Sequence, residues 1–161
     1  MHELTHLDRQ GRIRMVDVGE KPPTQRRAVA AGTLVLGPDI ARALQEGRTP
    51  KGNALEAARL SGIAAAKRTW ELIPLCHQIP LDHVQVEFEL LEDRVEIRAE
   101  AKAFAKTGVE MEALTAVAMA GLALYDMLKA LGKTMALTNV RLLEKEGGKS
   151  GRFVREENHE R

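Results

Sequence analysis

The chain has 161 residues and a formal net charge of +1, from 24 basic and 23 acidic side chains. This length suits a single domain, residues 1–161, with a sizeable core, and the charge balance steers the protein toward no particular partner. One Trp, one Tyr and three Phe are too few for a surface that stacks nucleic-acid bases. Cys76 is the single cysteine, which excludes an intrachain disulfide.

Targeting signals are not evident in the sequence. No apolar run approaches the roughly 18 residues that span a bilayer, and the first residues, MHELTHLDRQ, lack the basic-then-apolar pattern of a secretion signal. We therefore expect a cytoplasmic protein with no membrane partner and no nucleic-acid partner.

Three elements are expected before residue 50. Residues 12–18 alternate loosely and predict an amino-terminal strand, residues 21–27 predict a basic connector, and residues 29–36 predict a second strand. Pro38 suits the first position of a short helix, and Gly47 suits the position just after its end.

A longer, alanine-rich helix is expected next. Asn53 has N-cap character, with Glu56 three residues later, and the helix is predicted to run to about Trp70. Pro74 and Pro80 then bracket a loop.

A hairpin follows this loop. Residues 84–90 alternate apolar and polar side chains, residues 92–93 form the turn, and residues 95–101 return as the second strand. The predicted polar side of the hairpin carries acidic residues, which argues against an RNA-binding sheet. These residues are Glu87, Glu89, Glu96 and Glu100.

The segment 110–131 predicts a helix that is mostly apolar yet carries charges. At about 100° per residue, Glu112, Thr115, Asp126 and Lys129 fall on one side of it. Two interpretations remain open at this point: a structural ion pair, or a polar stripe that faces a cavity, a partner or solvent.

The last elements complete the fold prediction. Gly132 suits the position after the long helix, residues 140–143 predict a short strand, and residues 155–161 predict a frayed end. From residue 29 onward the order is β-α-α-β-β-α-β. This order predicts an α+β, ferredoxin-like (split βαβ) fold with an antiparallel sheet packed by helices.

Three apparent motifs lack the context that their chemistry requires. The H-E-x-x-H match begins at His2, on the first residues of the chain, and is followed closely by Asp8 and Gly11, whereas zinc chemistry needs both histidines on a helix, a third ligand and a cleft. Residues 147–151 resemble the end of a P-loop, but no helix pattern follows; a solvated tail and an anion-binding loop both remain open. Cys76, His77 and His83 fit no standard metal spacing, so no metal site is predicted.

Basic residues lie near both ends of the predicted Asn53 helix. Lys51 immediately precedes the predicted N-terminus of the Asn53 helix, a position that suits phosphate. Lys67 and Arg68 lie near the other end, where pairing with the helix dipole is the alternative. The whole set of cations suits a polyanionic small molecule handled by acid–base chemistry.

The chain closely resembles the molybdenum cofactor biosynthesis protein C family, the cyclic pyranopterin monophosphate synthases. The resemblance covers nearly the whole chain. It is carried by LTHLD, MVDVGEK, KGN, GIAAAKRTWELIPLCH, KTGVEMEALTAVAMAGLALYDMLKAL, VRLLEKEGGKSG and Phe153. The family often has aspartate where this chain has Asn53, and proline where it has Gln78.

This resemblance implies an enzyme that rearranges 3′,8-cyclo-7,8-dihydroguanosine 5′-triphosphate to cyclic pyranopterin monophosphate and releases pyrophosphate. It implies a ferredoxin-like fold, no cofactor, and a hexamer built as three dimers with active sites at the dimer interface. It assigns Asp126 as catalytic acid and Lys51 and Lys129 as catalytic lysines. The implied substrate-binding residues are Leu75, Cys76, His77, Met111, Glu112, Arg26, Lys67, Lys145 and Lys149.

The chemistry of these groups leads to two further expectations. Asp126 should raise the pKa of Lys129, which makes Lys129 an acid or electrostatic partner, whereas Lys51 is the better base if other cations crowd it. If two subunits share each site, mixing Lys51→Ala with Asp126→Ala chains should restore activity. A noncatalytic scaffold, with the charged stripe as an ion pair, is the rival interpretation.

Overall fold

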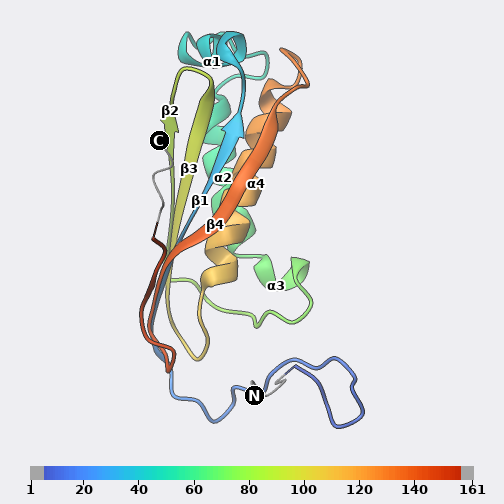
Figure 1. Cartoon of the computed structure of the whole chain (residues 1–161), viewed down its shortest axis with the longest axis vertical. Helices are drawn as coiled ribbons and strands as arrows, with labels where there is room; N and C mark the ends of the chain where they lie inside the picture. Colours follow the sequence, from blue (N-terminus) through green and yellow to red (C-terminus); the bar gives the residue numbers. More distant parts are fainter. Residues whose placement is uncertain (1–5, 157–161) are drawn as a thin grey trace.

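The computed structural model describes residues 6–156. Its centre is a five-stranded sheet in the order β2-β3-β1-β4-β5, in which all neighbouring strands are antiparallel. Helices α2 and α4 lie side by side over one face of this sheet (Figure 1). The elements are β1 Thr24–Val35, α1 Pro38–Gln45, α2 Ala54–Ala66, α3 Thr69–Leu72, β2 His83–Leu90, β3 Arg94–Ala105, α4 Glu110–Leu128, β4 Ala136–Glu146 and β5 Phe153–Val154.

The split βαβ prediction is confirmed. β1 lies in the interior of the sheet, paired with β3 on one side and β4 on the other. Helix α2, which follows β1 and α1, and helix α4, which follows β3, cross the same face. The expected α+β class with an antiparallel sheet is therefore the observed one.

The amino-terminal predictions are partly wrong. Residues 12–18 form no strand; they contribute one isolated bridge between Leu7 and Ile13. The basic connector is shorter than expected because β1 already begins at Thr24, and Arg27 pairs in register with Lys102 and Glu146. Strand pairing with two partners, which local sequence does not report, extends β1 into the basic segment.

The alanine-rich helix is interrupted. The Oδ1 atom of Asn53 accepts a hydrogen bond from the backbone N–H of Glu56 at 3.2 Å, which confirms the predicted cap. The helix ends at Ala66, however, and Thr69 begins the separate one-turn helix α3. The buried Thr69 hydroxyl donates to backbone carbonyls of the preceding turn, which ties the two helices together across the break.

The carboxy-terminal half differs from the prediction in length. α4 ends at Leu128 with Lys129 as its C-cap, three residues before the expected end at Leu131. β4 spans Ala136–Glu146 instead of four residues, and β5 was not predicted. Arg155 is not frayed, because its backbone N–H donates to the Leu143 carbonyl at 2.7 Å; residues 157–161 lie outside the described part of the chain.

Close helix packing explains the small residues. A Cβ atom at Gly62 of α2 would lie 2.9 Å from the carbonyl oxygen of Ala116 and 3.2 Å from the Cβ of Ala120, so only glycine allows this separation of α2 and α4. The inner side of α4 is fully buried through Ala113, Val117 and similar residues. By length and composition α4 is also apolar enough to cross a membrane, contrary to the expectation from the sequence. Its packing against the sheet accounts for that composition.

Candidate active site

The first group of predicted site residues meets at the upper end of α4 in Figure 1. The Nζ atom of Lys51, in the loop before α2, lies 2.8 Å from Oδ2 of Asp126. The Nζ atom of Lys129 lies 2.7 Å from Oδ1 of the same carboxylate. One carboxylate thus bridges two ammonium groups; we call these three residues the lysine–aspartate cluster.

Electrostatics in this cluster follow from its geometry. Hydrogen bonds from Lys129 and then Lys51 lower the pKa of Asp126 to about 2, and the carboxylate in turn raises the pKa of Lys129. The predicted effect on Lys129 is confirmed. Asp126 is therefore ionised at neutral pH, which favours an electrostatic role for it in the resting protein over proton donation. The expectation that Lys51 acts as the base assumed that other cations crowd its ammonium group. In the structure this group contacts a carboxylate instead.

The second group surrounds a hollow of about 350 Å³ at the opposite end of α4, which we call the cysteine pocket. Leu75, Cys76 and His77 come from the loop after α3, and Met111 and Glu112 come from the first turn of α4. The Nε2 atom of His77 lies 2.7 Å from the carbonyl oxygen of Val16. A carbonyl oxygen only accepts hydrogen bonds, so Nε2 is the donor in this contact. The His77 ring therefore carries a proton on Nε2.

Burial dominates the chemistry of the cysteine pocket. Glu112 is 4% exposed, and its burial raises its pKa to about 7, with the nearby Glu110 carboxylate adding to the rise. Burial and the charge of Glu112 also raise the pKa of Cys76, so the thiol stays protonated at neutral pH. Glu112 is thus a carboxyl group that can exchange a proton near neutrality.

A second hollow of about 310 Å³ adjoins the cysteine pocket and shares Lys21, Thr107, Gly108 and Glu110 with it. We call it the basic pocket. Its one acidic residue, Glu110, lies 3.7 Å (Oε1) from Nζ of Lys145. Five cationic side chains line it, and an anion with several charges fits this composition. They are Lys21, Arg26, Lys106, Lys145 and Lys149.

The glycine-rich segment 147–151 forms part of the basic pocket. It connects β4 to β5, and its Ser150 hydroxyl accepts a hydrogen bond from Lys145. Gly147 and Gly148 have φ values of 98° and 77°, and a Cβ on either would collide with Gln25 or Arg26. Of the two interpretations left open by the sequence, this placement favours the anion-binding loop.

Two residues that sequence reasoning missed belong to the basic pocket. Lys21 and Lys106 were not singled out, although both stand in segments that carry the family resemblance, MVDVGEK and KTGVEMEA. Lys67, in contrast, lies apart from the other predicted cations. It lines a third hollow with Trp70 and Gln78.

Apart from Lys67, the predicted site residues therefore occupy two separate places in one chain. Glu112 and Asp126 both belong to α4 but are 14 residues apart. At 1.5 Å per residue this separation is about 21 Å. Figure 1 shows the same division: the loop before α2 lies near the upper end of α4, and the start of α4 is its lower end.

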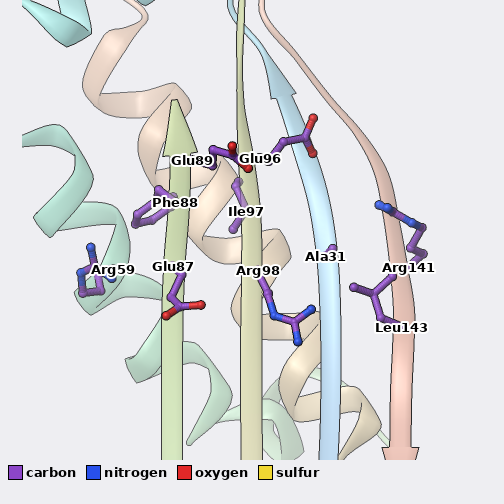
Figure 2. A pocket seen from close by; sticks show the side chains of 10 residues that line it. All are labelled: Ala31, Arg59, Glu87, Phe88, Glu89, Glu96, Ile97, Arg98, Arg141 and Leu143. Carbon is purple, nitrogen blue, oxygen red and sulfur yellow. The ribbon is translucent and has the colours of Figure 1, made fainter. Parts of the chain in front are cut away.

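A larger hollow, of about 620 Å³, contains none of the predicted site residues (Figure 2). It extends across β2, β3, β1 and β4. Its lining mixes Glu87, Glu89 and Glu96 with Arg98 and Arg141, so its charges do not select an anion. The H-E-x-x-H match falls outside the described residues apart from His6. Within residues 6–156, no three His, Cys, Asp or Glu side chains are grouped to hold a metal ion.

Fold and site together define a class. The chain is a split βαβ protein in which a buried carboxyl group and a lysine–aspartate cluster accompany a pocket suited to a polyanionic small molecule. Residues 15–148 match the family model described as MoaC family. The chain belongs to the MoaC family.

Curated relatives agree over the full length of the chain. A cyclic pyranopterin monophosphate synthase of Desulfatibacillum aliphaticivorans is 50% identical over 158 residues, 97% of this chain and 99% of that protein. One from Thermomicrobium roseum is 52% identical over 163 residues, 100% of this chain and 98% of that protein. Molybdenum cofactor biosynthesis protein 1 of Bos taurus is 51% identical over 155 residues, 95% of this chain but 24% of that protein.

Proposed function

We propose that this chain is a cyclic pyranopterin monophosphate synthase of molybdenum cofactor biosynthesis. It converts 3′,8-cyclo-7,8-dihydroguanosine 5′-triphosphate to cyclic pyranopterin monophosphate and releases pyrophosphate. The observation that carries this proposal is the basic pocket beside the cysteine pocket, in a chain about half identical to proteins of that name.

Each part of the site has a chemical task in this reaction. The cations of the basic pocket hold the triphosphate and stabilise the pyrophosphate as it leaves. Glu112, with a pKa of about 7, exchanges protons with the base as the purine ring opens. Lys129 stays protonated beside Asp126 and stabilises developing negative charge or donates a proton.

A single chain does not bring these parts together. About 21 Å of helix separates the lysine–aspartate cluster from Glu112, which is too far for both to act on one reacting centre. We therefore place each active site between two subunits, with the cluster from one and the two pockets from the other.

The outer side of α4 supports this arrangement. Met119 lies midway between Glu112 and Asp126 in sequence, and Leu122 beside it is 54% exposed. An antiparallel pairing of two α4 helices about a two-fold axis near Met119 buries this apolar centre. The same pairing sets Asp126 of each subunit opposite the partner's Glu112.

The larger assembly and the location in the cell extend the same proposal. We propose a hexamer of three such dimers, acting in the cytoplasm. Sedimentation equilibrium of the purified protein measures the first point: a mass of six chains supports the hexamer, and a stable monomer contradicts both the hexamer and the shared site.

The reaction itself is tested with purified protein and the cyclised guanosine triphosphate, following both pyrophosphate and the pterin product. The wild type should form both, and a folded Asp126→Ala variant should form neither at a comparable rate. Absence of product from a folded, assembled wild type would contradict the synthase proposal and favour the scaffold interpretation.

A further inference from the structure

Residues 6–21 form an extended segment outside the sheet and helices, which we call the amino-terminal strap. Figure 1 shows it passing below α3 at the lower end of the molecule. Its own structure is slight: Leu7 and Ile13 form an isolated bridge, and the backbone N–H of Arg14 donates to the His6 carbonyl at 2.9 Å. Ile13 and Met15 are 75% and 51% exposed, so little apolar burial holds the strap in place.

Two side chains of the body bind backbone carbonyls of the strap. His77 donates from Nε2 to the carbonyl oxygen of Val16 at 2.7 Å. Lys106 donates from Nζ to the carbonyl oxygen of Gly19 at 2.6 Å. Between and beside these points, Val16 and Val18 are half-buried and line the cysteine pocket.

The second anchored carbonyl lies within a compact turn. Oδ1 of Asp17 accepts from the backbone N–H of Gly19 at 2.8 Å, and the N–H of Lys21 donates to the Val18 carbonyl at 3.1 Å. These local bonds give the turn a defined shape, and the anchors give it a defined place. Lys21, at the end of this turn, lines both the cysteine pocket and the basic pocket.

We propose that His77 and Lys106 are positioning residues that fasten the amino-terminal strap over the cysteine pocket and thereby deliver Lys21 to the anion in the basic pocket. The ligand part of this proposal rests on the proposed function; the fastening of the strap does not.

This role differs from proton transfer by His77. The Nε2 proton of the ring is already donated to a backbone carbonyl of the same chain, so it is committed to holding the strap. For fastening the strap, the geometry therefore requires a hydrogen-bond donor at the position of Nε2 and does not require a basic ring.

Trypsin measures the fastening directly. The strap contains Arg9, Arg12 and Arg14, and Lys21 is protected from cleavage because Pro22 follows it. Cleavage follows the population of the released strap when release and rebinding are fast. His77→Ala and Lys106→Ala should each speed cleavage about five- to tenfold, the loss expected for one hydrogen bond. His83→Ala and Lys102→Ala, which remove the same residue types from β2 and β3, should leave the rate unchanged.

Conservative variants separate positioning from a general loss of structure. In His77→Gln the side-chain amide places an N–H donor where Nε2 was, and in His77→Asn it places one near Nδ1. Glutamine should restore the wild-type cleavage rate and KM, and asparagine should not restore protection. Equal behaviour of the two, or an unchanged rate in both His77→Ala and Lys106→Ala, would overturn the strap proposal.

Calorimetry with inorganic tripolyphosphate tests the delivery of Lys21. Lys21→Ala should weaken binding about tenfold with the cleavage rate unchanged, whereas His77→Ala should weaken binding and speed cleavage together. The same variants should raise KM more than they lower kcat. Normal tripolyphosphate affinity in Lys21→Ala would overturn the delivery of Lys21. If the wild type does not bind tripolyphosphate, the basic pocket is not an anion site and the delivery of Lys21 fails with it, while turnover still decides the proposed function and proteolysis still decides the strap.

Discussion

Lys51 and Asp126 are 75 residues apart in the chain, yet the Nζ atom of one lies 2.8 Å from Oδ2 of the other. The pair joins the loop before α2 to the last turn of α4, and Lys129 completes it from the other side of the carboxylate. All three side chains are about half exposed. In one chain the cluster is therefore open to solvent and to a partner, not sealed in the core.

Asp126→Asn should change catalysis without unfolding the protein. The variant removes both ion pairs, so the pKa of Lys129 falls from its raised value toward that of a free lysine. We expect turnover to drop on the order of 100-fold or more, and the alkaline limb of the residual pH–rate profile to move to lower pH.

Asp93→Asn is the matched control for this variant, because Asp93 also forms an exposed ion pair, with Arg94, in the β2–β3 turn. Steady-state kinetics extended to about pH 11.5, above the pKa of a free lysine, give the comparison, and thermal unfolding at each pH checks folding. An unshifted alkaline limb in Asp126→Asn would show that Lys129 does not set it.

The choice of inactive variants decides whether mixed subunits regain activity. Lys51→Ala with Asp126→Ala, the pair expected from the sequence to complement, should fail because the structure places both residues in one cluster. Asp126→Ala with Lys145→Ala should succeed, since one defect lies in the cluster and the other in the basic pocket.

With random exchange, half of the dimers are mixed and each has one intact site of two, so activity should reach roughly a quarter of the wild-type value. Exchange is verified by native mass spectrometry of differently tagged chains. Recovery by the first pair, or none by the second at full exchange, would rule out the division of the site proposed above.

Glu112→Gln should make stability less dependent on pH. The folded-state pKa of Glu112, about 7, exceeds its ordinary value of 4.5, so the folded protein binds this proton more tightly than the unfolded chain does. The stabilisation is complete below pH 4.5 and is lost as the pH rises through 7. Glutamine does not ionise. The free energy of unfolding of Glu112→Gln, relative to that of the wild type, should therefore grow by up to about 3 kcal/mol between pH 5 and 8. Urea unfolding at several pH values measures this difference; parallel curves for the two proteins would mean that Glu112 is not held protonated by burial.

Gly147→Ala should distort the basic pocket. Gly147 has φ 98°, and an added Cβ would collide with the backbone carbonyl of Gln25, which has no freedom to move aside. Gly151→Ala is the control, because Gly151 also has a positive φ, 66°, but open space around it. Both variants lose about 1 kcal/mol from the left-handed backbone. Only Gly147→Ala should also displace Lys149 and weaken tripolyphosphate binding several-fold, as measured by calorimetry. Equal affinities in the two variants would contradict a role for this loop in anion binding.

Much of this protein was determined by local sequence. The Asn53 cap, the β2–β3 hairpin and the apolar α4 all follow from patterns within a few turns or strand repeats, and each is present. The order of these elements then predicted the split βαβ sheet, and the family resemblance supplied the reaction. The raised pKa of Lys129 was also predictable, because Asp126 is three residues away on the same helix.

Features that depend on contacts between residues far apart in the sequence were decided only by the tertiary structure. β1 extends into the basic segment because β3 and β4 pair with it there. Arg26, Lys106 and Lys145 meet because the register of β1 with β3 and β4 brings three segments to one pocket, and Lys21 joins them from the amino-terminal strap. Burial of Glu112 is likewise a property of the packed molecule, since its neighbours in the sequence do not by themselves shield its carboxyl group from solvent. The division of the site between the two ends of α4 has the simplest cause: helix residues that share a side still lie 1.5 Å apart per position along the axis.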